Sequence, residues 1–282
     1  MTDLINLPVG KLSTEVEFKA KPSEPIRKSP SPEGTIGLDI LPPLYADEQH
    51  STWKELFRRQ ELILEGRVCQ EYLQGRALLQ YPNERVPDLA SLSERLRQAT
   101  GWQIIRVEGY VPEHIFFRLL ANKCFPCTDF IRHSTELEYT PAPDMFHDLM
   151  GHLPLITNPR FASFFHSYGL AGTRVQSDEE VAWLGRIYWF TVEFGLMNKN
   201  AHNPQLRDPK STQIYGAGIV SSVGEIMNSL SDVVKKEPFH AELVAQRPFD
   251  IHHMQDTLYE IESFDELEIE FRRWASNKAL LV

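Results

Sequence analysis

The sequence predicts a single, mainly α-helical domain with a few short β-strands. From about residue 51 onward, apolar residues recur at helical intervals with charged residues between them. Sustained strand-like alternation occurs at residues 103–111. The 282 residues, 42% of them hydrophobic, suit one substantial core, and no internal repeat interrupts them.

The N-terminal region differs from the rest of the chain. Residues 1–45 are rich in Pro, Lys, Ser and Glu and show no sustained period, so we expect a partly disordered arm. This segment is too short to form a second regulatory domain. We therefore assign residues 46–282 to the folded domain.

The helices are predicted in order from apolar spacing and helix-terminal residues. The first runs from about Ser51 to Leu64, and a second begins at Pro87 and stops at Gly101. The strand at 103–111 follows, and Pro112 begins a third helix. Further helices are expected at about 144–151, 159–171, 178–198, 219–235 and 264–276. The Asn- and Pro-rich segment 199–213 is predicted to be a surface loop or hairpin tip.

Charge and composition argue against several classes of function. The chain has 29 basic and 39 acidic residues and a formal charge of -10, which disfavours nucleic acids and anionic membranes as partners. No apolar run approaches the roughly 20 residues of a membrane span, and the first residues do not resemble a secretory signal. With three cysteines, too few for a disulfide framework, the expected location is the cytoplasm.

Cys124 and Cys127 form a C-F-P-C run that is compatible with a redox pair or half of a zinc site. A zinc site would need a second close pair, and the adjacent His252 and His253 lack ligand-like spacing. We therefore expect both cysteines to be core residues. A non-catalytic dithiol protein remains an alternative.

The run YTPAPDMFHDLMGHLP contains two histidines, His147 and His152, at an unusual spacing. Asp144 is a good helix cap, while Gly151 and Pro154 suit a helix end. Residues five apart on an α-helix point roughly 140° away from each other. We therefore expect the helix to end at Gly151, so that His152 can turn back toward His147.

Glu193 is the candidate third ligand. It is the only charged residue between Ile187 and Asn198. Its neighbours one helical turn away are all apolar: Trp189, Phe190, Leu196 and Met197. A carboxylate in such surroundings is strongly disfavoured unless it is paired or bound to a metal. Pairing with Arg132 or Arg186 is the simpler alternative.

Two histidines and one carboxylate leave open positions on a metal, which suits iron(II) that must bind oxygen and a substrate together. A zinc-dependent hydrolase could use the same His147, His152 and Glu193. The metalloprotease pattern, however, has histidines at i and i+4 with Glu beside the first, whereas Asp148 follows His147 here. This difference weakens the hydrolase hypothesis.

At these residues the chain resembles the pterin-dependent aromatic amino acid hydroxylases. The matching runs are DFIRHSTELEYTPAPDMFHDLMGHLPL, IYWFTVEFGL and IYGAGIVSSVGE, in family order, within a resemblance that covers roughly residues 100–265. The resemblance implies the catalytic domain of that family, with one Fe(II) held by His147, His152 and Glu193. Tetrahydrobiopterin, or another reduced pterin, and O2 would bind beside the metal.

The resemblance also implies residues for the two organic ligands. Arg132 matches the arginine that binds the substrate carboxylate. The other substrate positions are Thr140, Pro143, Trp189, Phe194 and Ser221. The pterin positions are Gly109, Tyr110, Val111, Phe116, Asp148 and Tyr188.

The chain departs from the family pattern at several places. Asp148 stands where animal members have Glu, Pro126 replaces a His, and about nine extra residues lie between Glu193 and Tyr215. The smaller members mostly convert L-phenylalanine to L-tyrosine, so this is the expected reaction. Hydroxylation of tryptophan or of the 3-position of phenylalanine are alternatives, although Trp189 disfavours tryptophan. The final residues are too short for a stable coiled coil, so a monomer or weak homodimer is expected.

Overall fold

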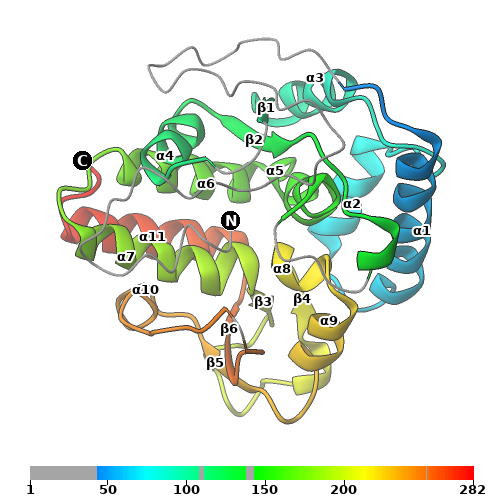
Figure 1. The fold of residues 1–282 in the computed structure, drawn as a ribbon. Coiled ribbons are helices and arrows are strands. Elements are labelled where there is room, and N and C mark those ends of the chain that lie inside the picture. Colours follow the sequence, from blue (N-terminus) through cyan, green and yellow to red (C-terminus); the bar gives the residue numbers. More distant parts are fainter. Residues whose placement is uncertain (1–42, 108–110, 138–142, 252) are drawn as a thin grey trace.

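A computed structural model describes residues 43–107, 111–137, 143–251 and 253–282. The predicted N-terminal arm, residues 1–45, therefore lies almost entirely outside the described residues. The described chain is mainly helical with a few short strands, which confirms the predicted fold class (Figure 1).

The helices differ in length and vary from α-helical to 3-10 and π-helical winding. In order they are α1 (Asp47–Leu64), α2 (Gln70–Leu79), α3 (Leu89–Thr100), α4 (Glu113–Ala121), η2 (Ser134–Glu136), η3 (His147–His152), α5 (Leu153–Ile156), α6 (Pro159–Gly172), α7 (Asp178–Tyr188), η4 (Trp189–Glu193), η5 (Pro209–Ser211), α8 (Ala217–Val220), α9 (Val223–Ser229), α10 (Ala241–Val244) and α11 (Phe264–Asn277). Two of these turns, η3 and η4, are π-helical.

The strands form two small sheets. The described strands are β1 (Gln103–Val107), β2 (Cys124–Thr128), β3 (Leu196–Met197), β4 (Gln213–Ile214), β5 (Lys235–Pro238) and β6 (Thr257–Ile261). β1 and β2 pair in parallel, whereas the second sheet has the order β4-β3-β6-β5. Strands β3 and β4 form an antiparallel pair, so segment 199–213 is the hairpin tip that the sequence predicts.

The ends of the longer helices follow from their terminal residues. The side chains of Asp88, Asn158, Ser177 and Ser263 each accept a hydrogen bond from a backbone N–H in the first turn of the helix that follows. Gly101 has a φ of 77°, which suits glycine and ends α3. The sequence therefore determines these boundaries locally.

Helix α6 lies at the centre of the domain. Helices α4, α7 and α11 pack against it, and α11 and α7 lie beside it in Figure 1, with α1 to α3 on the opposite side of the molecule. Aromatic rings fill this core: Phe164 meets Phe271 edge to face at 5.3 Å, and Trp102 stacks on Phe165 at 5.5 Å between ring centroids. Phe165 also lies 6.2 Å from Phe125, whose ring lies 5.1 Å from that of His152, so this aromatic core extends to η3.

Two of the predicted helices have other bounds in the structure, and one helix was not predicted. The helix expected at 178–198 ends at Glu193, since β3 begins at Leu196. The helix expected at 219–235 is divided, because Ser222 caps α9 by accepting the Glu225 N–H. Helix α2 was not predicted, since its apolar positions are interrupted by polar ones.

Two helical glycines differ in how closely other residues approach them. A Cβ built on Gly75 of α2 would lie 1.9 Å from the carbonyl oxygen of Pro154, so α2 and the turn at Pro154 touch through their backbones. Gly224 of α9 is exposed, and a Cβ on it would lie 3.3 Å from the flexible end of Met254 and 4.0 Å from Ser222 Oγ. Of the two, Gly75 is sterically required.

We predict that Gly75→Ala lowers stability, by about 1–3 kcal/mol or more, because the added methyl overlaps a backbone carbonyl. Gly224→Ala is the matched helical control and should be neutral or slightly stabilising. Thermal unfolding of both variants tests this difference. Equal melting temperatures would contradict the close contact between α2 and Pro154.

None of the helices in the described ranges is long and apolar enough to cross a membrane.

Candidate metal centre

Both segments that carry the predicted metal ligands are wound as π-helices. His147 and His152 begin and end η3, and Glu193 ends η4. In a π-helix the backbone hydrogen bonds join residues five apart, so His147 and His152 lie one above the other. The predicted helix end at Gly151 was wrong: the chain continues through Gly151 into α5, and the wider winding brings the two imidazoles together.

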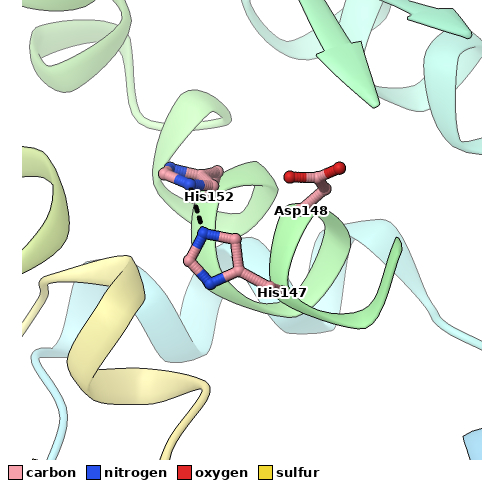
Figure 2. A group of neighbouring side chains, drawn as sticks. All are labelled: His147, Asp148 and His152. Atoms are coloured by element: carbon pink, nitrogen blue, oxygen red, sulfur yellow. Dashed lines mark hydrogen bonds between the residues drawn. The ribbon is translucent and has the colours of Figure 1, made fainter. Parts of the chain in front are cut away.

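The two histidine rings face each other at the end of this turn. Their Nε2 atoms are 3.0 Å apart, and Figure 2 shows the rings directed toward one another. His147 is 8% and His152 is 2% exposed, so the pair is buried. Two ligands bound at about 2.1 Å and at right angles on one octahedral ion are separated by roughly 3 Å. The observed separation fits a shared metal.

Glu193 reaches the same point from η4. Its Oε2 lies 3.6 Å from His147 Nε2, and its Oε1 lies 3.4 Å from His152 Nε2. The alternative partners are occupied elsewhere, since Arg132 pairs with Asp144 and Arg186 donates to the Ala245 carbonyl. Glu193 Oε1 is buried without a hydrogen-bond partner among the described residues. A cation at this point would satisfy it.

The tautomer of His147 is set by Ser221. The Ser221 hydroxyl donates to the Ala217 carbonyl at 2.8 Å, so its oxygen accepts a hydrogen bond from His147 Nδ1, also at 2.8 Å. The proton on Nδ1 leaves a lone pair on Nε2, which faces Glu193 and His152. Metal-binding histidines are commonly oriented in this way. Ser221 thus contacts the candidate ligand His147.

The charge states of the cluster also suit a metal. Burial lowers the pKa of His147 to about 4, so its imidazole is neutral at pH 7. Burial alone would raise the pKa of Glu193, but the neighbouring His152 and His147 lower it to about 2. A neutral imidazole and an ionised carboxylate are the forms that bind cations.

Asp148 offers a competing carboxylate. His147, Asp148 and His152 present ligand atoms within 4.8 Å of one another, and Figure 2 shows Asp148 to the side of the ring pair. However, Asp148 Oδ2 accepts hydrogen bonds from Thr128 N at 2.8 Å and from Thr128 Oγ1 at 2.9 Å. Burial raises its pKa to about 6. Glu193, whose pKa is lower and whose Oε1 has no hydrogen-bond partner among the described residues, is the stronger ligand candidate.

Helix α8 joins the two ligand-bearing turns. A Cβ on Gly151 would lie 2.9 Å from Ala217 Cβ, and one on Gly216 would lie 2.4 Å from the Glu193 carbonyl oxygen. At Gly218 a Cβ would lie 3.2 Å from Glu193 Oε2. The small residues of the IYGAGIVSS run therefore let α8 pack between η3 and η4.

Arg132 lies close to this cluster in sequence and is held by Asp144. Its Nε and Nη2 donate to the two carboxylate oxygens at 2.9 and 2.8 Å, and both side chains are buried. Asp144 Oδ1 also accepts the His147 N–H at 3.1 Å. The Nη1 atom of Arg132 has no partner among the described residues. Asp144 thereby fixes the orientation of the Arg132 guanidinium.

Aromatic rings line the other side of η4. Trp189 lies between Phe194, at 4.4 Å, and Phe249, at 4.6 Å between ring centroids and nearly parallel. Trp189 and Phe194 were predicted from sequence, whereas Phe249 was not. Phe249 was missed because it lies in a loop of mixed composition, 55 residues after Phe194.

The predicted pterin residues are partly brought together. Phe116 of α4 meets Tyr188 edge to face at 5.7 Å, and Tyr188 lies 6.4 Å from the His152 ring. Val111 is half-buried and packs against the hydrophobic core. The predicted substrate residue Pro143 is also half-buried and precedes Asp144 in the chain. The predicted residues Gly109, Tyr110 and Thr140 lie outside the described residues.

Cys124 and Cys127 lie in β2 as free, buried thiols. Burial raises the pKa of Cys127 well above its ordinary value, and its thiol donates to the Thr128 carbonyl. A thiol with a raised pKa is a poor nucleophile. The geometry therefore supports the core role that the sequence predicts.

Comparisons with known proteins agree with this site. The family model described as biopterin-dependent aromatic amino acid hydroxylase matches residues 37–280. The chain belongs to this family. It is therefore an oxidoreductase of the pterin-dependent monooxygenase class, and this membership disfavours the zinc hydrolase and dithiol alternatives.

Several relatives of this hydroxylase are bacterial. The chain is 40% identical over 224 residues to the phenylalanine-4-hydroxylase of Ralstonia nicotianae, covering 79% of this chain and 69% of the relative. It is 41% identical over 211 residues to the phenylalanine-4-hydroxylase of Pseudomonas aeruginosa, covering 75% of this chain and 77% of the relative. A solved Chromobacterium violaceum phenylalanine hydroxylase, with iron(III) and 7,8-dihydrobiopterin, has a TM-score of 0.76 and 39% identity, with 83% of each chain covered.

Asp144 is the structural centre of this region of the hydroxylase, and the sequence indicated only its role as a cap. Burial would raise its pKa, but the charge and hydrogen bonds of Arg132 lower it below the ordinary value. A carboxyl with a lowered folded-state pKa contributes stability above its unfolded pKa and loses this contribution as the pH falls.

We predict that Asp144→Asn costs about 3–5 kcal/mol at pH 7, because Arg132 remains buried without its counterion. The deficit should narrow below about pH 4, the ordinary aspartate pKa. Calorimetric melting temperatures between pH 3.5 and 7 measure it. Asp256→Asn, an exposed partner of Arg247, is the control and should change little. An equal deficit at every pH would contradict the ion-pair explanation.

Proposed function

We propose that the chain hydroxylates the ring of L-phenylalanine at the 4-position to give L-tyrosine, with Fe(II), tetrahydrobiopterin or another reduced pterin, and O2. His147, His152 and Glu193 would hold the iron. The observation that carries this proposal is the convergence of two imidazole nitrogens and one carboxylate within 3.0 to 3.6 Å. Such a set leaves open positions for other ligands, which suits iron that reacts with oxygen.

The residues around the proposed iron have separate tasks. When bound, iron(II) together with the reduced pterin would activate O2 for attack on the substrate ring. Ser221 keeps the proton on His147 Nδ1 and so directs the Nε2 lone pair inward. Gly218 leaves room beside the Glu193 carboxylate. The protein thereby supplies two imidazole nitrogens and one carboxylate in fixed directions.

The amino acid would bind between a cation and the aromatic rings. Arg132 is held by Asp144, so the free guanidinium edge is preoriented for the substrate carboxylate. Trp189 and Phe194, with Pro143, would form the wall beside the substrate ring. Thr140 belongs to the same proposal by its position in the family motif, although it lies outside the described residues. Burial of these groups would exclude water.

The pterin would bind beside the His152 ring, where Phe116 and Tyr188 meet. Phe116 would stack on the pterin, and Val111 would lie beside it. Gly109 and Tyr110, outside the described residues, complete the proposed loop. Asp148 would contact the pterin through its free oxygen, since Oδ2 is bonded to Thr128.

Phenylalanine is proposed as the substrate because the bacterial relatives of comparable length are named phenylalanine-4-hydroxylases. The clamped Trp189 supports this choice. Its indole packs against both Phe194 and Phe249, so the position of this wall is fixed by its neighbours. Tryptophan hydroxylation and 3-hydroxylation of phenylalanine are the alternatives on the same scaffold.

We also propose that residues 46–282 form the catalytic domain and that the enzyme acts in the cytoplasm. Three free, buried cysteines suit a reducing compartment. Helix α11 packs its apolar face into the core through Phe264, Leu267 and Phe271. Little of that face remains for a coiled coil, which supports a monomer or weak homodimer.

We expect the iron-loaded protein to convert phenylalanine to tyrosine in the presence of reduced tetrahydrobiopterin and O2. Phenylalanine, tyrosine and tryptophan would be incubated separately under labelled oxygen and analysed by mass spectrometry. Tyrosine carrying one labelled oxygen atom supports the proposal. Labelled 3-hydroxyphenylalanine or hydroxytryptophan as the main product would replace it with one of the alternatives.

Glu193→Ala should lower metal affinity by more than about 100-fold, because even residues that only support a metal ligand contribute 10- to 100-fold. Product formation should fall with it. Glu94→Ala serves as the control, because it removes an exposed carboxylate of α3 that pairs with Arg97 and not with the cluster. Activity with zinc and no oxygen uptake would disprove the monooxygenase proposal.

A further inference from the structure

Two tyrosine hydroxyls hold the π-helical turn from outside. Tyr72 of α2 donates to the Met150 carbonyl at 2.7 Å. Tyr81, which follows α2, donates to the Leu149 carbonyl at 2.6 Å. Burial raises the pKa of both hydroxyls, so both remain protonated donors. Both acceptors lie inside η3, between His147 and His152.

Pro154 removes one backbone donor from the end of η3. In an α-helix the Met150 carbonyl would accept from the N–H of residue 154, four positions later. In a π-helix the Leu149 carbonyl would accept from the same residue, five positions later. Residue 154 is proline and has no N–H. The tyrosine hydroxyls therefore supply donors to the two carbonyls that an N–H at residue 154 could have served.

The approach of α2 makes these bonds possible. Gly75 lies three residues after Tyr72, on the same helix face, and touches the Pro154 carbonyl through its backbone. Trp53 Nε1 donates to the Pro82 carbonyl at 2.8 Å, which holds the segment carrying Tyr81. Thus α1 and α2 together place both hydroxyls at the turn.

We propose that Tyr72 and Tyr81 are positioning residues that maintain the π-helical winding of η3 and so keep His147 and His152 on one point. This inference rests on the proposed function, in which these histidines hold the metal. Without the two hydroxyls, the Leu149 and Met150 carbonyls would each lose a buried hydrogen bond, which is unfavourable. The turn would then rewind or loosen, and the imidazoles would separate.

Tyr168 provides a matched control. Its buried hydroxyl donates to the Leu184 carbonyl of α7 at 3.3 Å, and burial raises its pKa as it does for the other two tyrosines. A Tyr168→Phe substitution therefore removes the same kind of hydrogen bond from a regular α-helix. It leaves η3 without a direct change.

The experiment compares Tyr72→Phe, Tyr81→Phe, the double variant and Tyr168→Phe. Cobalt(II) is the metal probe, with affinity measured by titration calorimetry and coordination followed by visible absorption. Hydrogen exchange of residues 147–153 in the metal-free proteins provides a second readout. We expect the double variant to lose about 10- to 100-fold in cobalt affinity, with an altered spectrum and faster exchange of these amides.

The outcomes separate the two proposals. Tyr168→Phe should lower the melting temperature while cobalt affinity stays within about twofold, since no contact to η3 is lost. Unchanged affinity and exchange in the double variant would overturn the positioning role. If the wild-type protein bound neither cobalt(II) nor iron(II), the proposed function would fail. The positioning role, which rests on it, would then fail as well, even if hydrogen exchange showed that the tyrosines stabilise the turn.

Discussion

Two imidazole rings five residues apart cannot face one atom from a regular α-helix, because the helix turns them away from each other. The protein meets this constraint by winding the segment from His147 to His152 as a π-helix. The second ligand segment, ending at Glu193, is wound in the same way. A π-helix is less favourable than an α-helix and is rare. Neighbouring elements must therefore stabilise both turns, and much of the packing around them has this effect.

Three buried carboxylates near the centre are each stabilised in a different way. Glu193 is ionised beside two imidazoles, and Asp144 is ionised in a two-point pair with Arg132. Asp148 accepts hydrogen bonds from Thr128, and burial raises its pKa. Since these environments lower two of the pKa values and raise the third, the same type of group serves as a candidate ligand, as the counterion of Arg132 and as a hydrogen-bond acceptor for Thr128.

Much of the site could be predicted from sequence because it depends on local contrast. Glu193 was identified as the lone charge in an apolar helix, and it does lie beside the two histidines. The reason given for the histidine spacing was wrong, since Gly151 lies within a continuous turn. Its small size serves the contact with Ala217 instead. Sequence periodicity assumes regular α-helices, so it does not reveal π-winding.

Other features depend on contacts between distant segments, which periodicity does not report. Tyr72 and Phe249 reach the site from elements far away in sequence. Helix α2 escaped prediction because its site-facing positions are Tyr72 and Gly75, neither of which extends an apolar stripe. The predicted roles of Gly109, Tyr110 and Thr140 lie outside the described residues and stay predictions.

The glycines of the IYGAGIVSS run show what a preserved motif can and cannot tell about a relative. Gly216 must lack a side chain because the Glu193 backbone lies against it, and residue 217 must be small because Gly151 lies against it. Both requirements hold whatever metal is bound. Selection for folding alone would therefore preserve this run. A related chain that lost its histidines could keep the motif and the fold while carrying out no hydroxylation. For such chains, the ligand positions themselves are the evidence of activity.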